Sequence, residues 1–405
     1  MLRPNRLFIC GGCLRSGGLF RLFCLRRPLP PFMLAAWARL LAAGAALASV
    51  SVCIITKIFS NRKKIAAAPE FYFTCAPFSI IMIGMDTNKG APAGAQNKGQ
   101  NHSLFEQPRK AASGIVYSGA VAAMLIFSLV YAVTLALVAQ ALGMTTAQLQ
   151  QTQACRYISY LVSDAAFLAV IAAFVKIYKE GPKQFGFCAF RPRYAVLALL
   201  LAFGTLFSLN WVNTGLAALL ERFGYTVPAA DLPSLEGAGF FGVLLVVALL
   251  PAFFEETLLR GIVLSGIKDC GTVAVCLLSG LLFAVLHMNP VQTVYQFICG
   301  CLFALIAVRS GSVIPSMIAH FANNAVILLD AKFLFFTNLS GTPLYILCAL
   351  SAAALLAVLA WLAFFDKSNA RKKEGAVKPF LVPAAVGLAV GALVWAVNLA
   401  SGFGG

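Results

Sequence analysis

Six polar side chains that lie in otherwise apolar stretches are the residues of this sequence that could do chemistry together. They are Glu255, Glu256, Arg260, His287, His320 and Asn324. An ionisable group inside a membrane span costs about 2.5–3.5 kcal/mol on insertion scales, so such groups usually mark function. Two of the three histidines in the chain belong to this set. The set predicts a polar site to which three helices contribute.

Residue spacing divides the acidic part of this set into two kinds of carboxylate. Glu256 and Arg260 are four residues apart, so they share one helix face and can neutralise each other. Glu255 is rotated from Glu256 by about 100° and can point elsewhere. A carboxylate without a cation partner in a dry bundle is suited to general acid–base work.

The histidines show the same spacing of four residues. His320 and Asn324 project from one helix face, as do Phe283 and His287. With Glu255, these faces offer one free carboxylate, two imidazoles and one amide. Such a set can activate a water molecule and stabilise an oxyanion.

Each part of the set also has a structural interpretation when it is taken singly. The Glu256–Arg260 pair is typical of a structural ion pair, and a histidine at a span end, such as His287, is often a packing residue. His320 and Asn324 could form hydrogen bonds between helices. Taken together, these three polar elements lie on three separate predicted helices, and this combination favours a functional site.

Composition identifies the medium in which these residues lie. Of 405 residues, 60% are hydrophobic and 11% are charged, against about 25% charged in a soluble domain. This excludes an ordinary soluble enzyme, a disordered chain and a nucleic-acid binder. The net charge of +17 is explained by Lys and Arg in cytoplasmic loops. We therefore expect an all-α, polytopic bundle of membrane-spanning helices.

Apolar runs of membrane length predict about nine spans, or about ten if Leu34–Phe59 is a real span. The nine runs are Gly114–Leu142, Ile158–Tyr178, Tyr194–Val212, Gly239–Gly266, Thr272–His287, Val291–Val308, Val313–Phe336, Pro343–Phe365 and Phe380–Phe403. The second run contains Asp164, which we interpret as structural or peripheral.

The connections between these runs alternate between many and few basic residues. Residues 85–112, 179–193 and 366–379 are rich in Lys and Arg, whereas 213–238 has a single Arg. Basic loops favour the cytoplasmic side. We expect a multi-pass cell-membrane protein whose N-terminus, counted from Met85, is cytoplasmic and whose C-terminus is outside.

The first 84 residues differ from the rest of the chain. They hold Lys and Arg in large excess over one acid, Glu70, and their one long apolar run has basic flanks on both sides. We expect residues 1–84 to be an extension that arises from a start assigned too early. Met85 then opens a polar cytoplasmic tail, 85–112, followed by a membrane domain, 113–405.

The fifth run, Thr272–His287, is short for a full crossing. The uncharged turn after it, 288–290, is compatible with burial, which non-helical backbone tolerates only where protein or a wet cavity covers it. We predict that the fifth and sixth runs form a short sunken hairpin that lines a polar cavity. Its other lining residues would be Gln292, Tyr295 and Gln296.

Three motifs in order give this chain a resemblance to a known family. They are Glu255-Glu256-Thr-Leu-Leu-Arg260, Phe283-Ala-Val-Leu-His287 and His320-Phe-Ala-Asn-Asn324. They resemble the EExxxR, FxxxH and HxxxN motifs of the CPBP intramembrane proteases (CAAX protease and bacteriocin-processing, or Abi, family). The resemblance covers residues 239–330, and each motif falls on a successive polar span.

The resemblance implies hydrolysis of a peptide bond inside the membrane. By analogy with the family, Glu255 and His287 would activate water, and His320 and Asn324 would hold the oxyanion. The supporting residues would be Glu256, Arg260 and Phe283. The implied partners are the bilayer and a membrane-embedded or lipid-anchored peptide, such as a prenylated or leader-type substrate, and not nucleic acid.

Metal dependence is left open by the motifs. A Glu and two His, here Glu255, His287 and His320, could bind zinc with an open position. The sequence has no HExxH motif, and we favour a metal-free glutamic mechanism without a cofactor. Two other functions compete with the protease: an ion- or proton-coupled transporter in which Glu255, Asp164 and the histidines form a relay, and a catalytically idle immunity or chaperone protein.

Overall fold

The computed structural model describes residues 109–229, 231–370 and 372–403. These residues belong to one structural unit. The expected extension 1–84, its run Leu34–Phe59 and nearly all of the expected tail 85–112 lie outside the described residues.

Helices account for the described part of the chain, which contains no β-strand, as the apolar runs predicted. The longer helices are α3 (Arg109–Ala141), α5 (Gln153–Tyr178), α6 (Arg193–Arg222), α10 (Thr272–His287), α11 (Thr293–Ser310), α12 (Ile314–Phe333), α13 (Thr342–Ala360) and α14 (Lys378–Gly402). The Gly239–Gly266 run is continuous but changes its winding: α7 (Gly239–Val243), η1 (Leu244–Leu249), α8 (Leu250–Glu256), η2 (Thr257–Val263) and α9 (Leu264–Gly266). A short helix, α4 (Thr146–Gln150), precedes α5, and η3 (Trp361–Phe365) extends α13.

Each of the nine predicted runs coincides with a helix. In the described residues, seven helices are long and apolar enough to cross a membrane. The exceptions are α10, which has 16 residues, and α12, which carries several buried polar side chains. The largest difference from the predicted bounds is α6, which continues beyond Val212 to Arg222 because the residues after the buried Asn213 are again mostly apolar.

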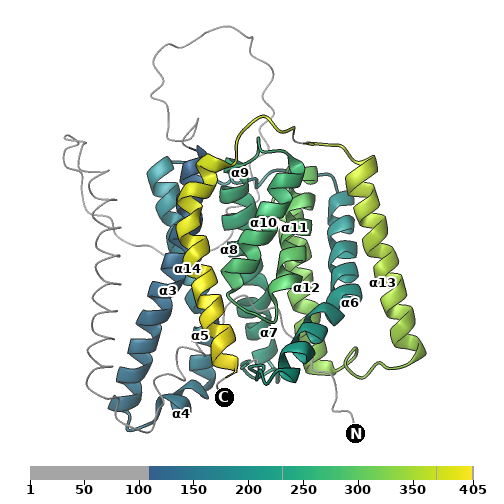
Figure 1. The fold of residues 1–405 in the computed structure, drawn as a ribbon. Coiled ribbons are helices and arrows are strands. Elements are labelled where there is room, and N and C mark those ends of the chain that lie inside the picture. Colours follow the sequence, from purple (N-terminus) through teal and green to yellow (C-terminus); the bar gives the residue numbers. More distant parts are fainter. Residues whose placement is uncertain (1–108, 230, 371, 404–405) are drawn as a thin grey trace, which may run out of the picture. The chain divides into compact units, whose positions relative to one another are not determined.

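Contacts at the helix ends order the bundle. Lys110, at the start of α3, donates to the carbonyl of Ala376 (3.0 Å) just before α14 and pairs with Asp269 (2.7 Å) just before α10. These three helices therefore begin at one end of the bundle, the upper end in Figure 1. Thr226, after α6, donates to Gly402 at the end of α14, so both of these helices finish at the other end.

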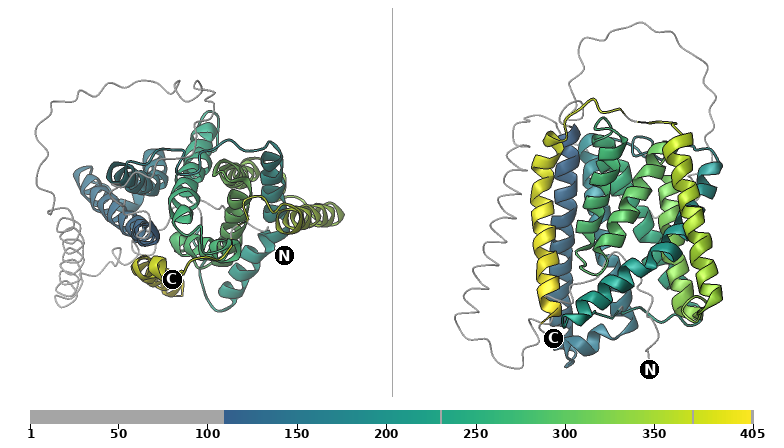
Figure 2. Two further views of the ribbon diagram at one scale, coloured as in Figure 1. Left: turned by 90° about the horizontal axis from the view of Figure 1, so that it is seen from above. Right: turned by 45° about the vertical axis from the view of Figure 1, so that its right-hand side comes forward.

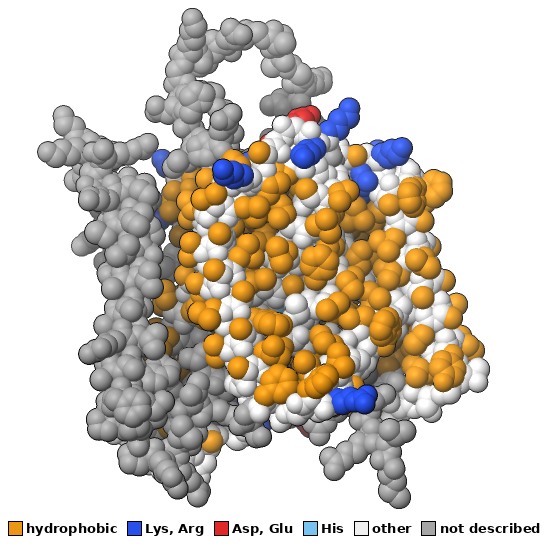
Figure 3. Space-filling view, in the orientation of Figure 1, with side chains coloured by type: hydrophobic (Ala, Val, Ile, Leu, Met, Phe, Trp, Pro, Cys, Tyr) orange, Lys and Arg blue, Asp and Glu red, His pale blue; other side chains and the backbone are white. Residues whose placement is uncertain are grey.

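The central helices carry the predicted site. Seen from above in Figure 2, α3 and α5 lie on one side and α6 with α13 on the other, with α8, α10, α11 and α12 between them. Figure 3 shows apolar side chains over the middle of one face and most of its Lys and Arg at the upper edge. This distribution fits a helix bundle surrounded by lipid, with a basic upper surface.

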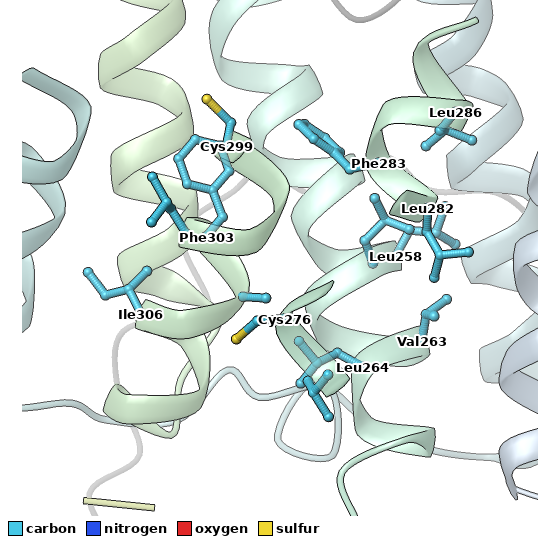
Figure 4. Packing of buried hydrophobic residues seen from close by; sticks show 14 of the residues in the cluster. Leu258, Val263, Leu264, Cys276, Leu282, Phe283, Leu286, Cys299, Phe303 and Ile306 are labelled. Atoms are coloured by element: carbon cyan, nitrogen blue, oxygen red, sulfur yellow. The ribbon is translucent and has the colours of Figure 1, made fainter. Parts of the chain in front are cut away.

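Two glycines allow α10 and α11 to pack closely. A Cβ atom built on Gly300 would lie 2.7 Å from the Cα of Gly280 and 2.9 Å from the Cβ of Phe283. Phe283 and Phe303 extend from these two helices into the buried core, with ring centroids 6.3 Å apart (Figure 4). Close backbone approach at small residues is the usual way in which helices associate in lipid.

The turn between α10 and α11 is buried, as predicted for a sunken hairpin. Met288 adopts a left-handed conformation (φ 48°) that ends α10. Asn398 of α14 donates to the Met288 carbonyl (2.8 Å), and Trp395 of α14 donates to Thr293 (2.7 Å). Protein therefore covers this non-helical backbone, as the absence of water in lipid requires. The hairpin is confirmed, whereas the polar cavity stays a prediction.

Candidate active site

A buried ion pair forms the centre of the site. Nη1 of Arg260 donates to Oε1 of Glu256 at 2.7 Å, and both side chains are fully buried. Nδ1 of His320 lies 3.1 Å from the same oxygen. Because a carboxylate oxygen accepts, the imidazole donates from Nδ1, and its Nε2 faces away from this bond. The pair thus joins α8 and η2 to α12.

Aromatic rings enclose the Arg260 cation. Its guanidinium carbon lies 4.5 Å from the ring centroid of Phe283 and 5.5 Å from that of Phe303. Nη2 also donates to the Gly300 carbonyl at 3.1 Å. Cation–π contacts are strongest where water is excluded, so this arrangement fixes the guanidinium between α10 and α11. It also fixes His320, which is stacked on Phe303 at 5.4 Å.

His287 has a defined tautomer. Its Nδ1 lies 2.7 Å from the carbonyl oxygen of Phe283, and a carbonyl can only accept, so Nδ1 carries the proton. Nε2 is buried and has no hydrogen-bond partner. The neutral ring therefore presents an unused lone pair inside the protein, as a general base requires.

Glu255 differs from its neighbour in the way that the spacing predicted. Its side chain is buried, and its Oε2 has no hydrogen-bond partner. It interacts electrostatically with Glu256, with Arg260 and with Asp164 of α5. Asp164, which we interpreted as structural or peripheral, is 2% exposed and therefore not peripheral, and its helix α5 packs against α8.

Asparagine side chains complete the polar surface on α12. Asn324 is fully buried, and its Nδ2 reaches only the Val247 carbonyl of η1, at 3.5 Å. This distance is at the limit for a hydrogen bond, so the amide can donate elsewhere at small cost. Asn323 accepts a 2.7 Å hydrogen bond from Tyr295. Tyr295, Gln292 and Gln296 are all buried on α11 or just before it.

Two π-helical segments, η1 and η2, flank α8. Such segments are rare and occur mostly at functional sites, because their wider winding shifts side chains and carbonyls out of α-helical register. Here η2 carries Arg260, and η1 supplies the Val247 carbonyl near Asn324. Residue spacing alone gives no signal for either segment.

The structure brings most of the predicted site residues into one buried region. Glu256, Arg260 and His320 are bonded directly, and the Phe283 ring contacts both His320 (5.7 Å) and His287 (4.5 Å). Glu255 and Asn324 belong to the same helices but make no hydrogen bond with these groups. The sequence did not reveal Phe303 or the Gly300 carbonyl, because neither residue type marks a site unless the neighbouring helix is known.

The zinc alternative was tested on the donor atoms. Within residues 109–229, 231–370 and 372–403, no three His, Cys, Asp or Glu side chains cluster at metal-binding distances. Glu255, His287 and His320 as they stand do not form a ligand set. One nitrogen of His320 is already bonded to Glu256.

A polytopic helical membrane protein with a buried Glu–Arg–His centre is the class that the fold and the site define. Residues 237–326 match the family model described as type II CAAX prenyl endopeptidase Rce1-like. This stretch contains all seven residues of the three motifs, so the match confirms the predicted resemblance. Comparison with curated proteins and with solved structures gave no match.

Proposed function

We propose that this protein is an intramembrane endopeptidase in which Glu255 and His287 activate the hydrolytic water. The observation that carries the proposal is a pair of unused buried acceptors, Glu255 Oε2 and His287 Nε2, inside the matched domain. Unpaired acceptors in a protein interior are costly. A bound water that donates to them would satisfy both and would be polarised for attack.

His320 and Asn324 are proposed to stabilise the oxyanion. With Nδ1 bonded to Glu256, His320 keeps its Nε2 for the developing negative charge. Asn324 can contribute its weakly held Nδ2. Removal of one such donor typically costs about 10²–10³ in rate. Glu256 and Arg260 would then act by holding His320 in place.

The proposed reaction has a simple proton balance. Glu255 takes a proton from water, with His287 holding the other hydrogen, while hydroxide oxygen bonds to the scissile carbonyl carbon. Collapse of the tetrahedral intermediate breaks the C–N bond, and Glu255 returns its proton to the leaving amine. No oxidant or second substrate is needed.

The substrate is proposed to be a membrane-associated peptide, either prenylated or of leader type. The site is nearer the basic end of the bundle: Glu255 lies eleven positions before the upper end of its helical run at Gly266, and His320 lies six positions after the upper end of α12 at Ile314. Basic ends favour the cytoplasm. We therefore propose a cell-membrane location in which the substrate enters from the cytoplasmic side and the C-terminus is outside.

The test uses the full-length chain in lipid nanodiscs with quenched fluorescent peptides that are farnesylated, unprenylated with a transmembrane anchor, or soluble. We expect cleavage of a membrane-bound peptide, and its loss in Glu255→Gln and His287→Ala. Matched controls are Glu236→Gln, at an exposed glutamate, and His102→Ala, the histidine outside the motifs. Absence of cleavage for all peptides, or activity that survives both site variants, would overturn the proposal.

A further inference from the structure

Asp164 of α5 is a buried carboxyl group that no motif explains. It is 2% exposed, and both of its carboxylate oxygens lack a hydrogen-bond partner. Burial of an ionisable group without compensation is expensive, and such groups in spans usually mark function. A buried carboxyl group with a structural role normally has hydrogen-bond partners.

The other two buried aspartates in the described residues have such partners. Asp330 accepts from the backbone of Phe336 and from the backbone and hydroxyl of Thr337. Asp366 accepts from Tyr194, Arg193 and the backbone of Ser368. Each of them ties a helix end to a loop. Asp164, in contrast, lies in the middle of α5 and makes no such hydrogen bond to another segment.

What Asp164 does have is a position next to Glu255. Helix α5 packs against α8, and the two carboxyl groups are close enough to interact electrostatically. They make no direct hydrogen bond with each other, since neither oxygen of Asp164 has a partner. Two carboxyl groups in one dry site cannot both be charged cheaply, which favours a single shared proton.

We propose that Asp164 is a positioning residue that acts through Glu255: the two carboxyl groups form a proton-sharing pair, and Asp164 sets the pH range in which Glu255 can accept a proton from water. This inference rests on the proposed function. The other charged groups near Glu255 are Glu256 and Arg260 of the same helical run. The titratable or charged groups near His287 of α10 are in turn His320 and Arg260.

The two adjacent glutamates have different neighbours, and this difference fits the proposal. Glu256 is held as an anion by Arg260 and His320, so it is unsuited to proton exchange. Glu255 has a second carboxyl group for a neighbour instead of a cation partner at hydrogen-bond distance. Coupled groups titrate as a pair rather than singly. The pair can therefore hold one proton while Glu255 takes and returns another.

The first test is the pH profile of kcat/KM in nanodiscs for wild type, Asp164→Asn and Asp164→Glu. On the acidic side of this profile kcat/KM falls as the pH is lowered, and we call this fall the acid limb. We expect Asp164→Asn to move the acid limb to lower pH by about one unit or more, because a negative neighbour no longer opposes ionisation of Glu255. Asp164→Glu should retain a limb close to that of wild type. The matched control is Asp231→Asn at an exposed ion pair, which should not move the limb. If Asp164→Asn lowers kcat/KM by the same factor at every pH and leaves the acid limb at its wild-type pH, the proposal is overturned.

The second test does not need turnover. Infrared difference spectra follow the protonated carboxyl C=O band of Asp164, labelled with ¹³C-aspartate, in wild type and in Glu255→Gln as the pH is changed. We expect the titration of this band to shift in Glu255→Gln. An unshifted band would overturn the coupling even in an active enzyme, whereas a shifted band in a protein that cleaves no peptide would indicate that only the proposed function has failed.

Discussion

Oε1 of Glu256 accepts from Nδ1 of His320 at 3.1 Å, although 64 residues separate them in the chain. The same oxygen accepts from Arg260. A single carboxylate oxygen thus fixes the imidazole of one helix to the guanidinium of another. The second glutamate of the first motif is therefore the one that bonds to the other site residues, whereas Oε2 of the first has no hydrogen-bond partner.

Replacing each of the two adjacent glutamates in turn should lower activity in both cases but stability in only one. We expect Glu255→Gln to lower kcat by about 10²–10⁴ with little change in thermal stability, because its Oε2 makes no hydrogen bond that could be lost. Glu256→Gln should lower both activity and stability, since Arg260 would be left buried without its anion. Peptide cleavage and thermal unfolding in detergent measure the two effects. Equal losses of stability in the two variants would contradict this assignment.

The buried ion pair should be far more important to stability than a surface pair. Arg260→Met leaves Glu256 buried without its cation, and we expect a cost of about 3–5 kcal/mol in unfolding free energy. The control is Arg156→Met, which breaks a partly exposed pair with Asp231 and should cost about 0–1 kcal/mol.

A double-mutant cycle checks that the loss comes from the pair itself. Glu256→Gln combined with Arg260→Met should cost less than the sum of the single variants, because neither group is then left alone. Additive losses would show that the two side chains act separately.

Close packing of α10 on α11 should be sensitive to one methyl group. Gly300→Ala would place a Cβ 2.7 Å from the Cα of Gly280, so the helices must separate, at a cost of about 1–3 kcal/mol. Cleavage should fall as well, because the Gly300 carbonyl holds Arg260. The control is Gly119→Ala in α3, where nothing lies within 4 Å of the new atom. A tolerated Gly300→Ala would contradict the close approach.

Asp366, outside the spans, should make stability depend on pH. Burial by itself would raise the pKa of Asp366, but hydrogen bonds from Ser368 and Tyr194 and the charge of Arg193 outweigh it and lower the pKa below the ordinary value of 3.8. A lowered folded-state pKa gives stability that is present above the unfolded-state value and is lost as the pH falls through the folded-state value.

The variant Asp366→Asn tests this linkage. Its melting temperature in detergent should be below that of wild type at neutral pH, and the difference should shrink as the pH is lowered past the ordinary carboxyl range. A difference that is constant with pH would show that the carboxylate charge has no part in it.

Metal chelators should leave cleavage unchanged if the glutamic mechanism is correct. The three candidate ligands do not form a cluster in the described structure, and His320 already uses one nitrogen for Glu256. Activity after dialysis against EDTA and 1,10-phenanthroline, with metal content determined by mass spectrometry, measures this. Loss of activity that added zinc restores would favour the metalloprotease instead.

The helices and the side-chain pairs within one helix could be predicted from the sequence because both depend on local periodicity. Long apolar runs show where helices lie, and the spacing of four residues paired Glu256 with Arg260 and Phe283 with His287. The short run before the uncharged turn at 288–290 also gave the buried hairpin. All of these are properties of one segment at a time.

The remainder could not be predicted because it depends on contacts between segments. Phe303 and the Gly300 carbonyl take part only because α11 crosses α10 at two glycines. Asp164 gave no sign of its position, since nothing in the sequence shows that α5 packs against α8. The π-helical winding of η1 and η2 has no residue signature in the sequence.

The hydrogen bonds from Trp395 and Asn398 to the turn after α10 give the last helix a role that the family match, which stops at residue 326, does not suggest. Without α14, the Met288 carbonyl would lose its donor, whereas the Thr293 hydroxyl would keep its hydrogen bonds to the Asn289 and Pro290 carbonyls. A fragment trimmed to the matched boundaries would thus lose the two donors that cover the buried turn after His287, so this turn depends on a helix well beyond the part that carries the motifs.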